Sequence, residues 1–493
     1  MKQIKIDPIT RLEGHGRIDI FLNDDGEVAN CYFVVPELRG FEQFAVGRPV
    51  EEMARITPRI CGVCPEAHHM AAAKATDEVY KVKIPSAGRK LRELLYNSFF
   101  AADHTVHFYA LGGPDFVVGP EAPPGERNIL GVIKKVGLEI GGKVIGLRAR
   151  CQEIIQTLGG KKIHQVTAIP GGVSKGITEE ERKKFEEYAK YMVDFGQFTF
   201  KLFDDVVLKN SQYVDLIVNG PYTQETYYMG LVDENNQVNF YDGKIRVVDP
   251  QGNEFCKYNP SEYLDHIAEH VEQWSYLKYP YLKKIGWKGF VGGKDSGVYQ
   301  ATPLSRLNAS DGMPTPLAQA EYEKYYKTLT GDSSGKKPVH NTLATHWARI
   351  IELQYATERV MNLITDPEIT SQDYRILPTE TPTEGIATVE APRGTLTHHY
   401  ATDERGIVTK ANLIVGTTNN YAAISMSIKR AAEGLIKKGQ EVTEGTLNKI
   451  EMAFRAYDPC LGCATHTLPG QMPLELHIKD KNGKIIQKVR HNI

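Results

Sequence analysis

Two cysteine pairs near opposite ends of the chain are the residues best suited to chemistry. Cys61 and Cys64 enclose two residues, and so do Cys460 and Cys463. One such pair is a weak signal, because redox dithiols and zinc knuckles share this spacing. Four thiolates at one site would bind zinc, an iron–sulfur cluster or another late first-row metal. Such a site requires a fold that brings together two segments separated by most of the sequence.

The spacing of the cysteines does not choose among these metals. Structural zinc sites usually take their ligands from a short module. Joining both ends of a 493-residue chain for one structural zinc ion would be unusual. A non-enzymatic scaffold held together by zinc stays open as an alternative, and the flanking residues must decide.

The composition is that of an ordinary globular protein, with 41% hydrophobic and 24% charged residues and a formal net charge of -2. This balance gives no electrostatic reason to expect a nucleic-acid partner. No apolar run is long enough to span a bilayer, and the first residues lack the apolar core of a signal peptide. We therefore expect a cytoplasmic protein, in which seven cysteines would not form a disulfide framework.

The elements that must position the cysteine pairs are mainly helical. Apolar periodicity predicts helices over 66–80, 90–111, 128–158, 178–209, 261–274, 317–328, 341–365, 421–438 and 443–457. The predicted helix 128–158 is weakly broken at Gly141 and Gly142. The predicted helix 178–209 begins with the capping-box sequence Thr178–Glu181. Several helices longer than average indicate a large helical-bundle core.

Strand patterns add smaller β elements to this body. Alternating residues predict an N-terminal antiparallel sheet within about 1–36 and a β-insertion within about 219–300, clearest at 222–256. We interpret 286–316 as a long ordered loop and 366–393 as loop with short strands. The tail after His466 has the pattern of a β-hairpin. The predicted fold class is α+β, mainly α with β additions.

The residues around the cysteines resemble the two signatures of the nickel–iron hydrogenase large subunit. These are Arg59–His68, which holds the first pair, and Asp458–His466, which holds the second. Further motifs of the family follow in the same order: Arg11–His15, Arg39–Glu42, His164 with Pro170–Gly172, and Glu390–Gly394. The set as a whole is specific, and the 39–61 region is most similar to the cytosolic, methanogen-type group.

The resemblance implies one binuclear centre and its reaction. Cys61 and Cys460 would be terminal nickel ligands, and Cys64 and Cys463 would bridge nickel and iron. The iron would carry carbon monoxide and cyanide, which assembly factors must install. The implied reaction is the reversible heterolytic cleavage of H2, with the Cys460 thiolate accepting the proton and Glu13 as its next stop.

Other motif residues would surround this centre. Arg393 matches an arginine that overhangs the open metal position, and whether Arg393 or Cys460 acts as the base stays open. Pro392, Asp103 and Asp458 would complete its surroundings. We expect a buried, paired carboxylate at Asp103, because it lies among Phe99, Phe100 and Phe108. By its position, His68 would donate a hydrogen bond to a cysteine sulfur. His398 and His399 have no implied role and are interpreted as core or surface histidines.

A second metal and a removable tail also follow from the resemblance. Glu42 and His466 match ligands of a magnesium site, for which iron or zinc is an alternative. Residues 467–493 match an extension that a maturation protease removes from the family's large subunits. We therefore expect a single catalytic domain over 1–466 and a C-terminal extension over 467–493.

The three remaining cysteines, Cys31, Cys151 and Cys256, have no iron–sulfur spacing. With no iron–sulfur cluster in this chain, the electrons must leave through a partner. The resemblance implies an iron–sulfur small subunit, with further redox subunits beyond it. A competing interpretation is the quinone-site subunit of respiratory complex I, which shares the fold but should lack the four cysteines.

Overall fold

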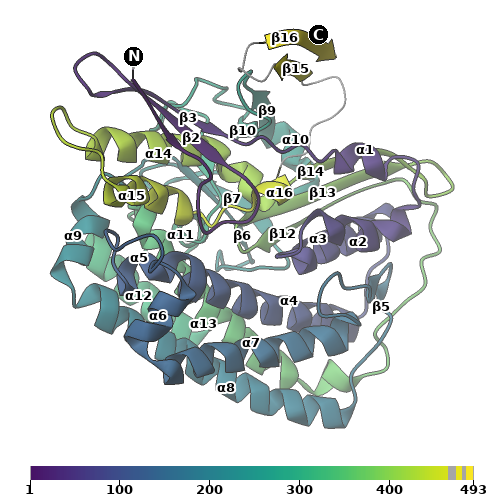
Figure 1. Ribbon diagram of the computed structural model, residues 1–493. Helices are drawn as coiled ribbons and strands as arrows, with labels where there is room; N and C mark the ends of the chain where they lie inside the picture. The colour runs from purple at the N-terminus through teal and green to yellow at the C-terminus, as the bar shows by residue number, and fades with distance from the viewer. Residues whose placement is uncertain (1, 465–473, 480–484, 492–493) are drawn as a thin grey trace.

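The computed structural model describes residues 2–464, 474–479 and 485–491 (Figure 1). The helices have the following bounds: α1 Phe41–Ala45, α2 Met53–Ile56, α3 Pro65–Val79, α4 Ser86–Val106, α5 Gly113–Val117, α6 Ile129–Val136, α7 Leu138–Gly159, α8 Glu179–Phe203, α9 Ser211–Asn219, α10 Tyr263–His266, α11 Pro303–Asn308, α12 Pro316–Thr330, α13 Thr345–Ile364, α14 Tyr421–Leu435, α15 Glu444–Arg455 and α16 Leu461–Ala464.

A layer of long helices forms the body of the molecule. α4 packs against α7 and α13, and α8 packs against the same two helices. Figure 1 shows α4, α7, α8 and α13 side by side in the lower half of the view. α13 buries residues around nearly its whole circumference, as expected of a helix enclosed by other helices. α8 begins at the predicted capping box, in which Thr178 and Glu181 bond reciprocally.

Two helix predictions differ from the structure. The segment 128–158 divides into α6 and α7 at Gly137, whose φ of 94° suits glycine, and not at Gly141 and Gly142. The helix predicted over 261–274 is only the short α10, after which the chain turns into a strand. Elsewhere the expected helices form, with π-helical turns at His107–Gly112 after α4 and at Asp204–Leu208 after α8.

The predicted N-terminal sheet and β-insertion are both present. The N-terminal sheet is antiparallel in the order β1-β2-β3. The β-insertion is a sheet in the order β11-β6-β7-β8, beside a β9–β10 hairpin. The strands are β1 Lys2–Ile6, β2 Arg17–Leu22, β3 Val28–Val34, β6 Tyr227–Val232, β7 Lys244–Val248, β8 Glu254–Tyr258, β9 Ile267–Val271, β10 Lys278–Leu282 and β11 Tyr299–Gln300. The region 286–316, predicted as loop, contains β11 and α11.

A third sheet lies beside α3 and was predicted only as loop with short strands as far as residue 393. It has the antiparallel order β12-β13-β14, from β12 Glu384–Ala391, β13 Gly394–Thr402 and β14 Val408–Ile414. α3 packs on β12 and β13. A Cβ at Gly385 would lie 2.1 Å from the carbonyl oxygen of Ala75, so this contact needs glycine. The sheet thereby fixes the position of α3, which begins directly after Cys64.

Two small hairpins complete the described elements, β4 Ala168–Ile169 with β5 Gly172–Val173, and β15 Leu474–Lys479 with β16 Ile485–His491. The second is the predicted C-terminal hairpin. A large apolar core joins the helices to the N-terminal sheet, and a smaller one lies under β6–β8. The α+β prediction, mainly helical with small sheets, is confirmed. Among the described residues, no helix is both long and apolar enough to cross a membrane.

Candidate metal centre

Both cysteine pairs lie at the starts of helices and meet in the interior. Cys64 directly precedes α3, and Cys460 directly precedes α16, which contains Cys463. The Sγ atoms of Cys61 and Cys460 are 3.3 Å apart, as are those of Cys64 and Cys463, and those of Cys460 and Cys463 are 2.9 Å apart. All four sulfurs lie within 4.8 Å of one another. The predicted convergence of the four thiols is confirmed.

The chemistry of this donor set fits a metal. All four cysteines are free and at most 5% exposed. Burial raises the pKa of Cys460 and of Cys463, whereas hydrogen bonds from the other thiols lower the pKa of Cys61. Four buried thiolates in contact would repel one another, so full ionisation requires a cation among them.

Glu13 contacts the second cysteine pair, as the sequence motif predicts. Its Oε2 lies 2.9 Å from Cys460 Sγ and accepts a hydrogen bond of 3.0 Å from the Gly462 amide. The Leu461 amide donates to the Glu13 carbonyl at 3.0 Å. Burial, followed by the nearby Cys61, raises the pKa of Glu13. A carboxyl group that touches a thiol and has a raised pKa is suited to proton exchange with it.

Arg393 is held between two carboxylates. Its guanidinium lies 3.0 Å from Asp103 Oδ2 on α4 and 3.0 Å from Asp458 Oδ2, two residues before Cys460. Burial alone would lower the pKa of Arg393, but Asp103 and Asp458 outweigh it and raise it. Arg393 Nε and Asp103 Oδ1 are buried and lack hydrogen-bond partners among the described residues. The paired, buried carboxylate expected at Asp103 is present.

The prediction for His68 is wrong. Its Nδ1 lies 3.2 Å from His398 Nε2, and its Nε2 has no hydrogen-bond partner within the described part of the chain. The fully buried histidines 68 and 398 pair with each other, so no bond to a cysteine sulfur forms. His398 in turn lies 2.6 Å from the Tyr400 hydroxyl, and His399 bonds Tyr263. Both 398 and 399 are therefore core histidines.

Only half of the predicted second metal site can be examined, since His466 lies outside the described residues. Glu42 is completely buried, and its Oε1 accepts from the Leu413 amide at 2.8 Å. Lys278 Nζ, 3.5 Å from the same oxygen, supplies a counter-charge. Glu42 Oε2 has no hydrogen-bond partner among the described residues, so this oxygen could bind a cation.

Sequence reasoning missed several residues that position the site. The Thr417 hydroxyl accepts from the Cys460 amide at 3.0 Å, which fixes the start of the second pair. Arg39, noted only as part of a motif, donates to the Ile60 carbonyl at 2.7 Å and reaches the Gly462 carbonyl at 3.4 Å, so it links the two cysteine segments. Thr417 belongs to no recognisable motif. Its role could not be found without the fold.

The fold and the site define a metalloprotein whose metal ligands come from both ends of one chain and meet in a mainly helical core. Comparison with known proteins then gives the family. The model of the nickel-dependent hydrogenase family matches residues 39–122 and 143–466, and a HoxL-like model matches residues 3–38. The chain belongs to the nickel-dependent hydrogenase family. It is an enzyme, an oxidoreductase that acts on H2 at nickel and iron.

Individual relatives agree over the whole chain. It is 48% identical over 491 residues to an F420-non-reducing hydrogenase iron–sulfur subunit of Archaeoglobus profundus, covering 100% of both chains. It is 38% identical to the "NAD-reducing hydrogenase HoxS subunit beta" of Cupriavidus necator, covering 99% of each. An NAD+-reducing nickel–iron hydrogenase solved in the H2-reduced state is 34% identical, with a TM-score of 0.87 over 94% of this chain and 100% of that chain.

Proposed function

We propose that this chain cleaves H2 reversibly into protons and electrons at a nickel–iron pair held by Cys61, Cys64, Cys460 and Cys463, and passes the electrons to an iron–sulfur subunit. The observation that carries the proposal is the convergence of four buried thiols, one of them 2.9 Å from the Glu13 carboxyl oxygen. In this arrangement all four cysteines would hold the metal pair, and carbon monoxide and cyanide would complete the ligands of the iron.

The residues of the chain supply the proton path and the fixed charge. When bound, the metal pair supplies the electron-pair acceptor that heterolytic cleavage of H2 requires. Cys460 Sγ takes the proton and transfers it to Glu13 Oε2 over their 2.9 Å contact. Arg393, whose pKa is raised, stays protonated and presents a fixed cation rather than a base. Asp103 and Asp458 hold its guanidinium, and Pro392 precedes it in the turn.

Metal analysis and infrared spectroscopy of the purified native complex test this function. We expect nickel together with iron in excess of nickel, because the iron–sulfur partner contributes iron of its own, and we expect carbonyl and cyanide bands. Cys460→Ala should abolish H2 uptake, whereas Cys151→Ala, which removes a buried thiol on α7 far from the cluster in sequence, should keep it. Zinc in place of nickel would instead support the scaffold interpretation. The complex I interpretation is already disfavoured, because it predicts that the four cysteines are missing.

The electrons must pass from the metals to a partner, and the features of one face of the molecule indicate where that partner binds. Among the described residues, the only cysteine group suited to a metal is the four-cysteine cluster of the proposed nickel–iron pair, so no second cluster is available to carry the electrons. Gly62 and Val63, between the first two ligands, are exposed. A cavity beside them is lined by Ile163 and shares Val106 and Arg148 with an apolar groove between α6 and α7. The exposed apolar residues that line the cavity and the groove are Val63, Ile129, Ile145 and Ile163.

We infer that the iron–sulfur subunit binds this face, since an electron carrier must approach the metals closely and a large exposed apolar area favours a protein partner. Ile145→Asp with Ile163→Asp should abolish H2-driven dye reduction through the partner, while exchange between D2 and solvent protons persists. Leu377→Asp, at a residue 68% exposed elsewhere, is the control and should leave both reactions intact. Undiminished partner binding by the double variant would refute this location.

We also propose a second metal and a cleaved tail. The unpartnered buried Glu42 Oε2 supports a magnesium site completed by His466, with iron or zinc as the other candidates. The family match that ends at residue 466 supports removal of 467–493 by a maturation protease. Mass spectrometry of the mature chain tests the cleavage, and a metal assay of Glu42→Gln tests the site. The absence of a membrane-crossing helix among the described residues is compatible with a cytoplasmic location.

A further inference from the structure

The turn that carries Arg393 joins β12 to β13 through only two residues. Ala391 pairs with Gly394 across the hairpin, so Pro392 and Arg393 form its tip. The sequence motif Glu390–Gly394 brought this arginine to notice but gave no role to Glu390. Because Arg393 lies between Asp103 and Asp458, a small rotation of the tip would move its guanidinium away from both carboxylates. What fixes the tip is therefore a functional question.

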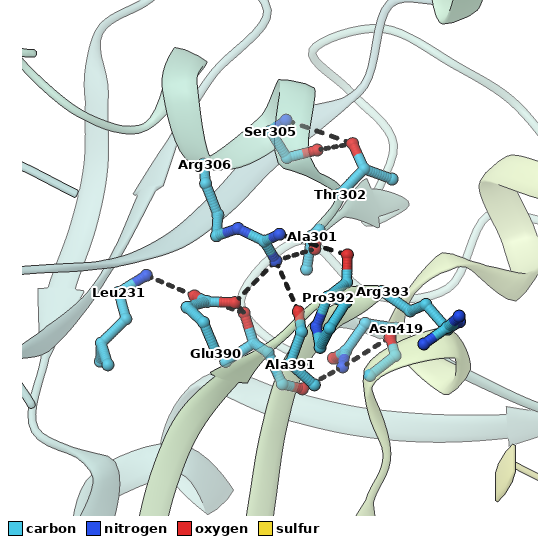
Figure 2. A network of polar contacts seen from close by, with 12 residues as sticks. Leu231, Ala301, Thr302, Ser305, Arg306, Glu390, Ala391, Pro392, Arg393 and Asn419 are labelled. Carbon is cyan, nitrogen blue, oxygen red and sulfur yellow. Dashed lines mark hydrogen bonds and ion pairs between the residues drawn. The ribbon is translucent and has the colours of Figure 1, made fainter. Parts of the chain in front are cut away.

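Arg306 on α11 contacts the backbone of this turn. Its Nη1 donates to the Ala391 carbonyl at 3.0 Å and its Nη2 to the Pro392 carbonyl at 3.3 Å. Nη1 also lies 3.0 Å from Glu390 Oε2. Figure 2 shows Arg306 on one side of the turn, with the Arg393 side chain pointing away from it. The arginine that lies between Asp103 and Asp458 is thus supported from behind by a second arginine.

Arg306 is itself fixed by surrounding groups. Glu352 on α13 binds it with both oxygens, at 2.6 Å to Nε and 2.7 Å to Nη2. Its side chain has no exposed surface. The remaining carbonyl of the turn, that of Arg393, accepts from Asn420 at 2.7 Å. The carbonyls of residues 391, 392 and 393 are therefore all bound by buried side chains, and the orientation of the turn is defined.

We propose that Arg306 is a positioning residue for Arg393: by binding the Ala391 and Pro392 carbonyls while Glu352 and Glu390 hold its guanidinium, it sets where Arg393 stands between Asp103 and Asp458. This inference rests on the proposed function. The planar fork of arginine can serve two carboxylates and two carbonyls at once, whereas a lysine ammonium is a single point of charge. In some proteins a buried ion network is retained for conformational specificity rather than for net stability, and a positioning role for Arg306 agrees with that use.

A double-mutant cycle tests the inference. Arg306→Lys keeps the charge between Glu352 and Glu390 but loses the fork, and we expect exchange between D2 and solvent protons, per bound nickel, to fall on the order of 100-fold, as small misplacements do. Arg393→Lys should also be impaired. If Arg306 acts through Arg393, Arg306→Lys has no additional effect in the Arg393→Lys background.

Arg92 provides a matched control. It is also fully buried, and it binds Asp77 together with the Gly172 and Ile169 carbonyls, without a contact to the 390–394 turn. In the double variant, the fold-decrease in exchange rate caused by Arg92→Lys should multiply with the fold-decrease caused by Arg393→Lys. If Arg306→Lys multiplies in the same way, or leaves the exchange rate unchanged, the positioning role is refuted.

Amide hydrogen–deuterium exchange in the metal-free chain gives a readout that does not depend on activity. Arg306→Lys should accelerate exchange in a peptide covering 390–397 and leave a peptide from α8 unchanged; no acceleration there refutes the inference. An active Arg393→Lys variant would refute the proposed role of Arg393, while the amide result would still judge whether Arg306 holds the turn. Should Arg306→Lys fail to fold, Glu390→Gln, which removes one partner charge at constant shape, takes its place in both measurements.

Discussion

At the scale of single residues, the site depends on close contacts that tolerate little change. Glu13 illustrates this, because its carboxyl oxygen contacts both a thiol and the Gly462 amide. The sequence motifs brought Glu13, Arg393 and Asp458 to notice, since each belongs to a recognisable string, whereas Asp103 was identified by its place on a predicted helix among phenylalanines. They misassigned His68, because its pairing with a histidine 330 positions away is a property of the fold. Arg306 and Thr417 stand in no motif and could not be found.

Glu13→Gln should leave nickel and iron in place and block proton exchange, since the amide keeps the size of the side chain but cannot carry a proton between sites. We expect the rate of D2–proton exchange to fall about 10²–10⁴-fold, the usual contribution of a positioned acid or base. Glu37→Gln, which changes the surface partner of His15, is the control. An exchange rate equal to that of the parent enzyme would remove Glu13 from the proton path.

Gly462→Ala should impair the enzyme although it replaces no ionisable residue. A Cβ at this position would lie 2.6 Å from Glu13 Oε1, so the carboxyl group must move away from Cys460. We expect a fall on the order of 100-fold in the exchange rate at unchanged nickel content. Gly62→Ala is the matched control in the other cysteine pair, because nothing lies within 4 Å of its Cβ position. Equal rates for the two alanine variants would contradict the crowding argument.

At the scale of elements, local signals predicted the structure where local interactions determine it. The capping box fixed the start of α8, and turn residues and alternation identified the N-terminal sheet. The β12–β14 sheet was not recognised because residues on both faces of β12 and β13 are buried, so the polar–apolar alternation of a half-exposed strand is missing. The helix predicted over 261–274 failed for a related reason: β9 pairs with β10, and this pairing overrides local propensity.

Thr178→Ala tests the start of α8. The Thr178 hydroxyl accepts from the Glu181 amide at 3.1 Å, and the Glu181 carboxylate accepts from the Thr178 amide at 2.8 Å. Losing this cap should lower the free energy of unfolding by about 1 kcal/mol, measured in denaturant. Thr178→Ser, which keeps the hydroxyl, should restore most of it. A stability loss shared by the serine variant would mean that the methyl group, and not the cap, matters.

At the scale of the whole molecule, burial extends to ionisable groups that are not among the proposed metal ligands. His69, His104 and His346 are at most 4% exposed, and burial lowers their pKa values to about 4, 4 and 3. In the unfolded chain each would titrate near its ordinary value of 6.5. Between these values the unfolded state binds more protons, so stability is complete above pH 6.5 and falls as the pH drops toward 4.

Urea unfolding of the metal-free protein between about pH 7.5 and 5 should show this acid destabilisation. Each buried neutral histidine contributes up to about 1.4 kcal/mol per pH unit below about 6.5. His346→Gln should therefore reduce the slope by about that amount while lowering stability at neutral pH. Metal-free protein is needed because protonation of the cysteines would otherwise contribute. An unchanged slope in the variant would show that His346 accepts a proton in the folded state.

The distance along the chain between the two cysteine pairs has a consequence for biosynthesis. Cys61 and Cys460 are 399 positions apart, so the ribosome delivers the first pair long before the second. A nascent or truncated polypeptide holds only two of the four ligand thiols, too few to retain the metals, and only a chain translated nearly to its end can complete the site. Metal insertion therefore requires a chain synthesised nearly to its end, and incomplete products do not become active enzymes.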